Sequence, residues 1–167
     1  GKAAFWHSSA HILAQSLLSK YPQAKLTIGP AIENGFYYDV DFGDASFSEN
    51  DLTSLEEQFL IFAKEKFEFK MRMSSKSDAL KFYQKENNPY KIELIENLED
   101  GTISFCDHAD FTDLCRGGHI PHSGLIKAVK LLSVAGAYWR GDETKPQLTR
   151  IYAVSYTHLR AHETADN

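Results

Sequence analysis

The spacing of apolar residues along the chain first predicts helices. Residues 3–20 place apolar side chains three and four positions apart with no glycine or proline between them, which is the repeat of an amphipathic helix. Residues 48–66 repeat the pattern, and Ser48 followed by Asp51 is typical of a helix start. Two shorter helices are expected over residues 77–86 and 90–98.

Alternation of apolar and polar positions predicts strands elsewhere. Residues 67–73 alternate in this way and should form a half-buried strand with one wet face. Residues 26–42 are aromatic and β-branched but contain Gly-Pro and Asn-Gly pairs, which indicates a strand pair with turns. Further strands are expected over residues 102–111, 127–134 and 148–154.

The order of these elements favours an α+β fold. Helices and strands are interleaved without the regular strand–helix–strand repeat of parallel sheets, and no internal repeat or low-complexity linker divides the chain. We therefore expect a single domain in which helices flank an antiparallel sheet.

Composition narrows the class of protein. The 167 residues are 43% hydrophobic, enough to fill a core, and no apolar run is long enough to cross a membrane. The first residues lack the layout of a secretion signal, and two cysteines are too few for a disulfide scaffold. We expect a cytoplasmic protein that contacts no membrane, with Cys106 and Cys115 as free thiols.

Charge is uneven along the chain. The net charge is −5, which argues against nucleic-acid binding through the overall field. Residues 116–150, however, hold six basic and two acidic residues, so this stretch is +4 and the remainder is −9. The stretch is either the surface that meets a polyanion or an ordinary solvated face.

Two pairs of residues have the spacing of a chemical site. His7 and His11 are four apart, so a helix places both imidazoles on one face, unless they are ordinary surface histidines. Cys115 and His119 flank a Gly-Gly turn that lets both face one site, unless Cys115 is a buried core thiol. Together they supply four nitrogen and sulfur donors, the ligand inventory of tetrahedral zinc. A metal-free site is equally consistent: a neutral histidine polarises a water, and a lysine or backbone donor stabilises the oxyanion.

A third segment, residues 131–142, combines small and aromatic residues. Its Ala-Gly-Ala run permits close backbone approach, while Tyr138, Trp139 and Arg140 have the chemistry to stack on a base or hold a phosphate. The alternative is that this aromatic cluster belongs to the core.

These segments together resemble the editing domain of bacterial threonyl-tRNA synthetase, which is related to the editing domains of alanyl-tRNA synthetase. The match covers about residues 4–153, in the same order. The segments that carry it are His-Ser-Ser-Ala-His at 7–11, Leu-Thr-Ile-Gly-Pro at 26–30, Glu-Asn-Gly-Phe-Tyr-Tyr-Asp at 33–39, Pro-Tyr-Lys at 89–91, Phe-Thr-Asp-Leu-Cys-Arg-Gly at 111–117, Ala-Gly-Ala-Tyr-Trp-Arg-Gly-Asp at 135–142 and Leu-Thr-Arg-Ile-Tyr at 148–152.

The resemblance implies a proofreading hydrolase that releases serine from mischarged seryl-tRNA(Thr). Serine and threonine differ by one methyl group, worth only about 1–3 kcal/mol in a single pocket, so a second, smaller pocket supplies the missing selectivity. The implied partners are the 3′ acceptor end of tRNA(Thr) and the rest of the synthetase. Because the ATP-dependent aminoacylation core is absent from these residues, this chain is not expected to charge tRNA.

The resemblance also implies roles for individual residues. His7 and Lys91 would position or activate the water, and Asp113 would hold the seryl amino group, with help from the terminal ribose hydroxyl. The residues carried over as catalytic are His7, His11, Lys91, Cys115 and His119, and those carried over as substrate-binding are Gly29, Tyr38, Asp113 and Arg116.

Two departures from the family bear on these expectations. Gly118 stands where the family usually has proline, which should loosen the loop and brings it closer to the zinc-binding Cys-Gly-Gly-x-His of alanyl-type domains. We expect no cofactor; if zinc binds, its ligands are His7, His11, Cys115 and His119. The alternatives are a non-catalytic fragment that binds the tRNA acceptor end and a zinc-dependent alanyl-type hydrolase.

The resemblance ends after Ala153. We therefore expect the editing domain over residues 1–153 and a non-native or disordered tail over residues 154–167, in which His158 and His162 have no function.

Overall fold

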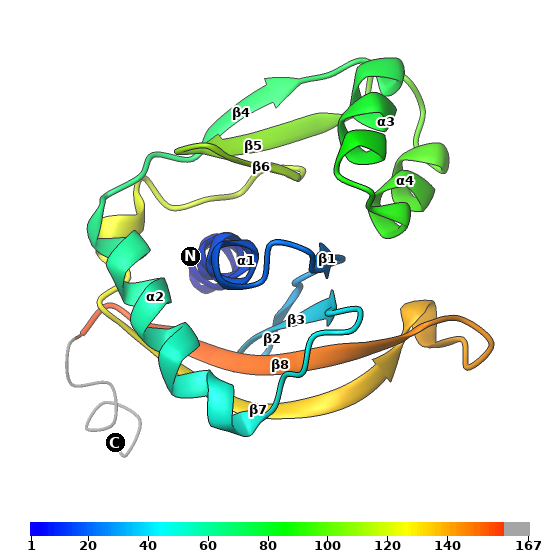
Figure 1. Cartoon of the computed structure of the whole chain (residues 1–167). Helices are drawn as coiled ribbons and strands as arrows, with labels where there is room; N and C mark the ends of the chain where they lie inside the picture. Colours follow the sequence, from blue (N-terminus) through cyan, green and yellow to red (C-terminus); the bar gives the residue numbers. More distant parts are fainter. Residues whose placement is uncertain (159–167) are drawn as a thin grey trace.

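A long central helix lies between two antiparallel sheets (Figure 1). The computed structural model describes residues 1–158. Helix α1, Lys2–Lys20, runs between the larger sheet below it and the smaller sheet above it in this view, and helix α2, Leu52–Lys64, closes one side. The α+β architecture expected from the sequence is confirmed, with two sheets rather than one.

The larger sheet has five strands, in the order β1-β3-β8-β7, with β2 paired to the start of β3. Tyr38 of β3 pairs with Ile151 of β8, and a bulge between Leu131 and Ser133 interrupts the pairing of β7 with β8. The strands are β1, Lys25–Leu26; β2, Ala31–Ile32; β3, Gly35–Asp41; β7, Ala128–Tyr138; and β8, Gln147–Tyr156.

The smaller sheet holds β4, Lys70–Met73, β5, Ser104–His108, and β6, Phe111–Leu114, in that order. Helices α3, Lys76–Lys85, and α4, Pro89–Glu96, connect β4 to β5. The sequence prediction of one strand over residues 102–111 was wrong at its end. Ala109 adopts a left-handed φ of 52°, which turns the chain and separates β5 from β6.

Strand β4 also differs from its predicted burial. The strand exists, but Met71 and Met73 are 41% and 64% exposed. Of the alternating apolar residues, Phe67 and Phe69 are partly buried; they precede the strand and pack against the main core. The apolar residues of β4 itself therefore lie at a surface edge.

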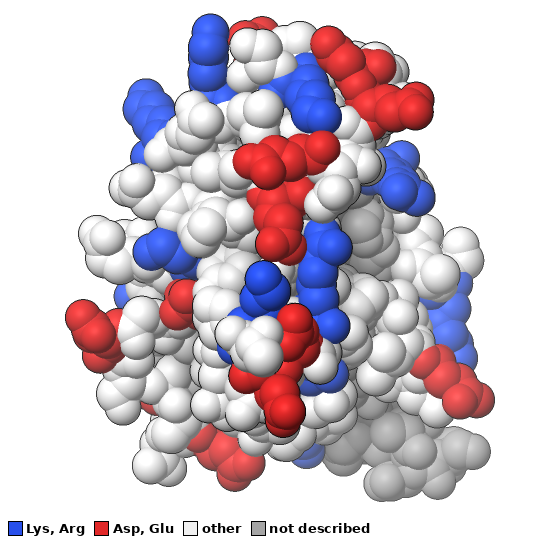
Figure 2. All heavy atoms as spheres, turned by 90° about the vertical axis from the view of Figure 1, so that its right-hand side faces the viewer, with Lys and Arg blue, Asp and Glu red and all other residues white. Residues whose placement is uncertain are grey.

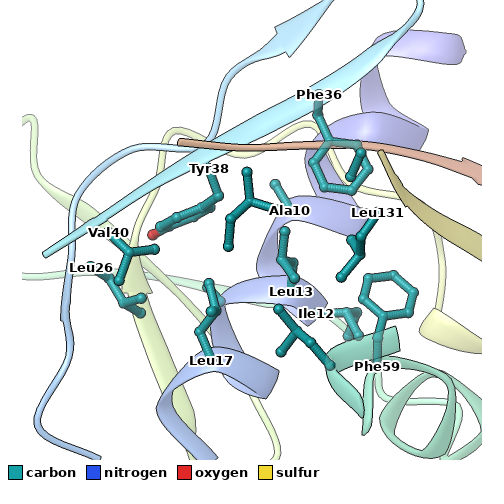
Figure 3. Close-up of a cluster of buried hydrophobic side chains, with 14 of the residues drawn as sticks. Ala10, Ile12, Leu13, Leu17, Leu26, Phe36, Tyr38, Val40, Phe59 and Leu131 are labelled. Carbon is teal, nitrogen blue, oxygen red and sulfur yellow. The ribbon is translucent and has the colours of Figure 1, made fainter. Parts of the chain in front are cut away.

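Helix α1 is buried around its whole circumference, not on one side as an amphipathic surface helix would be. Its buried run extends from Trp6 to Leu17. Leu13 and Leu17 pack among side chains of β1, β3, β7 and α2 (Figure 3). The buried polar residues have local partners: the Ser16 hydroxyl, for example, donates to the carbonyl of Ile12 at 2.7 Å. Such internal hydrogen bonds allow a helix to be enclosed on all sides.

The predicted start of α2 is confirmed. A 3₁₀ turn, Glu49–Asp51, leads into the helix, and Ser48 and Asp51 form a reciprocal capping box. The Ser48 backbone N–H donates to Asp51 Oδ2 at 2.8 Å. Two other 3₁₀ turns occur among the described residues, at Ser123–Leu125 and Trp139–Gly141.

The last strand continues beyond the point where the resemblance ends. Strand β8 runs to Tyr156, and Ser155 is buried, with its hydroxyl 2.6 Å from that of Ser9 on α1. The expected division at residue 153 therefore falls inside β8. His158 is exposed, whereas His162 and the rest of the expected tail from residue 159 lie outside the described residues. No helix of residues 1–158 is long and apolar enough to span a bilayer.

Candidate functional site

A cavity of about 920 Å³ opens where the two sheets approach each other beside α1. Its walls come from the first half of α1, the β1–β2 loop, α4, and the end of β6 with the loop that follows. Of the nine residues singled out from the sequence, eight line it, and His119 adjoins it through Cys115. The structure therefore brings the whole predicted set together.

The four predicted nitrogen and sulfur donors form one cluster. Cys115 Sγ lies 3.0 Å from His7 Nε2 and 3.3 Å from each Nε2 of His11 and His119. The backbone N–H of Gly117 also donates to this sulfur, at 3.2 Å. The sulfur is thus surrounded by four hydrogen-bonding groups.

A second group of charges adjoins the first through His11. Asp113 Oδ2 lies 3.4 Å from His11 Nδ1, and Asp113 Oδ1 lies 2.8 Å from Lys91 Nζ. The three side chains are at most 7% exposed. A continuous path of polar contacts therefore runs from Lys91 through Asp113 and His11 to the Cys115 sulfur.

Burial and polar contacts shift the pKa values of the groups on this path in opposite directions, and the polar contacts have the larger effect. Burial alone would lower the pKa of His11, but Asp113 and Cys115 raise it to about 9. Burial alone would raise the pKa of Cys115, but hydrogen bonds from His11, His119 and His7 lower it to about 4. Burial would also raise the pKa of Asp113, yet Lys91 and His11 hold it well below its usual range. At neutral pH the site contains a thiolate, a carboxylate and an imidazolium.

Two glycines shape the loop that carries His119. Gly117 and Gly118 adopt φ of +104° and +87°, a region that side chains disfavour. Proline, with φ fixed near −65°, does not fit the conformation of Gly118, so the loop follows a path closed to proline at this position. The hydroxyl of Ser8, from α1, accepts the backbone N–H of Ile120 at 2.9 Å and ties the end of the loop to the helix.

Lys91 is positioned by the start of α4. Asn88 caps this helix, accepting the backbone N–H groups of Tyr90 and Lys91 at 3.1 Å each, and Pro89 occupies the first turn. The Asn88 side chain also donates to the carbonyl of Leu26, at 2.8 Å, on the way to the β1–β2 loop. One asparagine therefore links two walls of the cavity.

Gly29 and Tyr38 form a closely fitted wall. A Cβ on Gly29 would lie 2.3 Å from the Tyr38 ring, so only glycine permits this approach. Tyr38 is 2% exposed, and its hydroxyl has no hydrogen-bond partner among the described residues. Arg116, in contrast, is exposed at the rim of the cavity.

Sequence reasoning missed the residues that support this set: Ser8, Tyr83 and Asn88. Asn88 had a readable signal, because asparagine before proline is typical of a helix start. Ser8 and Tyr83 had none, since their partners are remote in the sequence.

The four donors fit a tetrahedral zinc site. Their ligand atoms all lie within 4.8 Å of one another. Tetrahedral bonds of about 2.0–2.3 Å place neighbouring donors about 3.3–3.8 Å apart, close to the sulfur–nitrogen distances observed. Asp113 would support His11 from outside, as carboxylates commonly do for metal-bound histidines. The donor set therefore fits both a zinc ion and a hydrogen-bonded thiolate.

The basic stretch does not form a continuous patch. Arg150 makes a bidentate pair with the buried Asp39, at 2.8 and 2.9 Å, and Arg140 pairs with Glu93 at 2.9 Å. Trp139 is 4% exposed and donates to Glu93 at 2.7 Å, so it belongs to the core that joins the β7–β8 hairpin to α4. The face with α3, α4 and this hairpin shows acidic and basic side chains intermingled (Figure 2).

Comparison with known proteins places these residues in a family. The family described as "Threonyl and Alanyl tRNA synthetase second additional domain" matches residues 103–152, which include β5, β6, the glycine loop and much of β7 and β8. A threonine–tRNA ligase of Flavobacterium psychrophilum is 63% identical over 156 residues, or 93% of this chain. The corresponding enzymes of Cytophaga hutchinsonii and Parabacteroides distasonis are 56% and 53% identical over the same length.

The match covers 24% of each of these relatives, so the chain spans about a quarter of their length. The aligned quarter is nevertheless nearly the whole of this chain, and the conserved-domain match includes the cysteine end of the cavity. The chain therefore belongs to the threonyl-tRNA synthetase family, and its residues 103–152 match the second additional domain of threonyl- and alanyl-tRNA synthetases.

Proposed function

We propose that this domain hydrolyses the aminoacyl ester of seryl-tRNA(Thr), releasing serine and free tRNA. The observation that carries the proposal is the buried path from Lys91 through Asp113 and His11 to Cys115, which opens into a cavity large enough for an aminoacyl-adenosine end. Buried groups with strongly shifted pKa values in a cleft are typical of catalytic sites.

In the proposed mechanism His7 and Lys91 act on the water and the ester. The Cys115 thiolate accepts the Nε2–H of His7, which leaves Nδ1 of the neutral ring as the acceptor for a water proton. The Lys91 ammonium, fixed by Asp113, supplies positive charge where the tetrahedral oxyanion develops. The water attacks the ester carbonyl, and the tRNA ribose oxygen leaves with a proton, assisted by the neighbouring hydroxyl.

Asp113 has a narrower proposed role than the resemblance alone implied. Lys91 and His11 already occupy both of its oxygens. The seryl ammonium would therefore share this carboxylate with two existing cations. Its contribution to substrate binding is expected to be that of a carboxylate shared among three cations, rather than of a free acceptor.

Selectivity would come from the rigidity of the cavity walls. The fitted contact of Gly29 with Tyr38 and the hydrogen-bonded Cys115 cluster leave little freedom to adjust around one extra methyl group. A pocket that accepts serine and excludes threonine completes a double sieve.

We further propose that hydrolysis needs no metal. The charge of the Cys115 thiolate is satisfied by three imidazoles and the Gly117 amide, and that of Asp113 by Lys91 and His11. If zinc binds to His7, His11, Cys115 and His119, it supplies a Lewis acid for water activation. The proposed partners are the tRNA(Thr) acceptor end and the remaining three quarters of the synthetase, in the cytoplasm.

The decisive experiment is single-turnover deacylation of preformed seryl-tRNA(Thr) and threonyl-tRNA(Thr) by this chain, with and without a chelator. We expect serine to be released and threonine to be retained, with no effect of the chelator. Equal rates on both esters would contradict the sieve. Weak RNA binding without hydrolysis would support the non-catalytic alternative, and stoichiometric zinc with chelator sensitivity would support the alanyl-type mechanism.

A further inference from the structure

Tyr83 is a buried tyrosine behind the cavity whose hydroxyl reaches one of the charged groups within it. The residue lies on α3, is 4% exposed, and packs in the second core cluster with Ile103 and Phe105. It does not line the cavity. Its ring is therefore structural, but its hydroxyl has a separate set of contacts.

The Tyr83 hydroxyl joins two strand residues at the cavity wall. It accepts the backbone N–H of Leu114 at 2.9 Å and donates toward Asp113 Oδ1 at 3.4 Å. Lys91 Nζ contacts the same carboxylate oxygen at 2.8 Å. Because the Leu114 amide occupies a lone pair of the phenol and the proton needs an acceptor, the buried O–H is directed at Asp113.

The main chain of Tyr83 contributes at the other end of the same ion pair. Its carbonyl accepts the backbone N–H of Asn88 at 2.9 Å. Asn88 in turn caps the first turn of α4 and bonds the backbone of Lys91. One residue thus contacts both the carboxylate of the Lys91–Asp113 pair and the cap that places the lysine.

We propose that Tyr83 is a positioning residue for the hydrolysis: it fixes the orientation of Asp113, so that one carboxylate oxygen meets Lys91 and the other meets His11. This inference rests on the proposed function. Without the phenol, Asp113 is free to rotate toward Lys91, its closer partner, and its weaker contact with His11 at 3.4 Å is lost. Small displacements of a catalytic group cost rate rather than binding.

The test is Tyr83→Phe, which keeps the ring in its core and removes only the hydroxyl. We expect the saturating single-turnover rate on seryl-tRNA(Thr) to fall about 10-fold to 100-fold, while the protein concentration for half-saturation stays the same. The matched control is Tyr90→Phe. Tyr90 is also 4% exposed and donates to a carboxylate, Asp41 Oδ2 at 2.6 Å, that lies outside the cavity lining. This control should lower stability without changing the rate.

A double-mutant cycle identifies Asp113 as the route of the effect. Tyr83→Phe should cost little further rate when Asp113→Asn is already present, because residues that act through one another are not additive. The same loss in both backgrounds, equal slowing by Tyr90→Phe, or an unchanged rate in Tyr83→Phe would each overturn the inference.

Urea unfolding keeps this test separate from the proposed function. If the parent chain fails to hydrolyse seryl-tRNA(Thr), the proposed function is wrong. The urea midpoints of unfolding still test whether the Tyr83 hydroxyl contacts Asp113. Tyr83→Phe should then lower the midpoint of the parent chain more than that of Asp113→Asn. Equal decreases would show that the hydroxyl stabilises only the Leu114 amide and would overturn the inference.

Discussion

At Cys115 the sulfur is surrounded by hydrogen-bond donors, and this bears on whether it acts as a nucleophile. Burial opposes ionisation, but the three histidines lower its pKa to about 4, so the thiolate is present throughout the neutral range. A thiolate of such low pKa is intrinsically a weaker nucleophile, and its lone pairs are already occupied. The aminoacyl ester is activated enough for water. We therefore expect Cys115 to shape the cavity and hold His7 rather than to form a thioester.

The division of roles predicts a ranking of variants. His7→Ala and Lys91→Ala should each slow single-turnover hydrolysis of seryl-tRNA(Thr) by about 10²–10⁴-fold, the range for losing a positioned acid, base or charge. Cys115→Ala should cost less, because a water can replace the sulfur among the imidazoles. A larger loss in Cys115→Ala than in both other variants, with a thioester trapped at low pH, would reverse these roles.

Lys91→Ala needs a companion variant, since it leaves the buried Asp113 carboxylate with His11 as its one remaining charged partner among the described residues. The double variant with Asp113→Asn removes that uncompensated charge. We expect it to regain unfolding stability while remaining as slow as Lys91→Ala. Recovery of the rate together with stability would show that Lys91 serves the fold alone.

His108 predicts how stability depends on pH. The His108 side chain is buried, with 2% of the residue exposed. Burial, together with the positive charge of His11, lowers the pKa of His108 from 6.5 to about 3. A depressed pKa gives stability that is present above pH 6.5 and is lost as the pH falls toward 3. Between pH 7 and 5 this group alone should account for a loss of about 2 kcal/mol in the free energy of unfolding.

The matched variant is His108→Gln, which does not titrate. In the parent chain, Nε2 of His108 lies 3.1 Å from Oε1 of Gln15, and the amide of the new glutamine can still donate to that oxygen. Urea unfolding measured from pH 7 to pH 5 should show a slope against pH that is shallower than in the parent chain by about 0.7 proton on average. Parallel curves would mean that His108 takes up protons equally in the folded and unfolded states, so that burial does not lower its pKa. Contributions from His11 and Cys115 are common to both proteins and cancel in the comparison.

At the scale of elements, the link between α1 and the glycine loop depends on Ser8. Ser8→Ala leaves the backbone N–H of Ile120 without its acceptor, which should cost about 1–3 kcal/mol of unfolding free energy and speed hydrogen exchange at that amide. Ser16→Ala is the control on the same helix, since its buried hydroxyl bonds only to the carbonyl of Ile12. Unchanged exchange at Ile120 in Ser8→Ala would show that the loop holds its position without the helix.

Sequence spacing identified four members of the site because each pair is local, whereas the other five came from the resemblance to the family. His7 with His11, and Cys115 with His119, are four residues apart, so helical geometry and a glycine turn bring each pair together before any tertiary contact forms. That the two pairs meet depends on the packing of α1 between the sheets. The spacing of residues within each pair carries no information on that packing. The resemblance to the family, whose motifs occur in the same order, does carry that information.

The elements that sequence reasoning misjudged are those decided by tertiary contacts. Helix α1 has serines and a glutamine where an amphipathic helix has its wet face, yet these residues are buried and paired. The β5–β6 turn depends on a left-handed alanine, Ala109, a residue type that gives no turn signal. Arg150 was assigned to a basic face, but its partner Asp39 is 111 residues distant.

At the scale of the whole molecule, the charge distribution predicts weak and salt-dependent RNA binding. Two of the six basic residues of the stretch, Arg140 and Arg150, are already paired with carboxylates, so few phosphates can be neutralised. Lys127→Glu and Lys130→Glu should weaken tRNA binding in a salt titration without changing the preference for serine. Lys20→Glu, the same charge change outside the stretch, is the control, and an equal effect would indicate only net charge.

The cavity is lined by residues of both sheets, and the smaller sheet packs against α3 and α4 through a separate core cluster. The width of the cavity therefore depends on the distance between the larger sheet and the layer formed by the smaller sheet with α3 and α4. Under the proposed function, the discrimination of one methyl group depends on this distance. Substitutions deep in the α3–α4 layer that change this distance slightly should therefore weaken the proposed selectivity for serine without replacing any of the proposed catalytic residues.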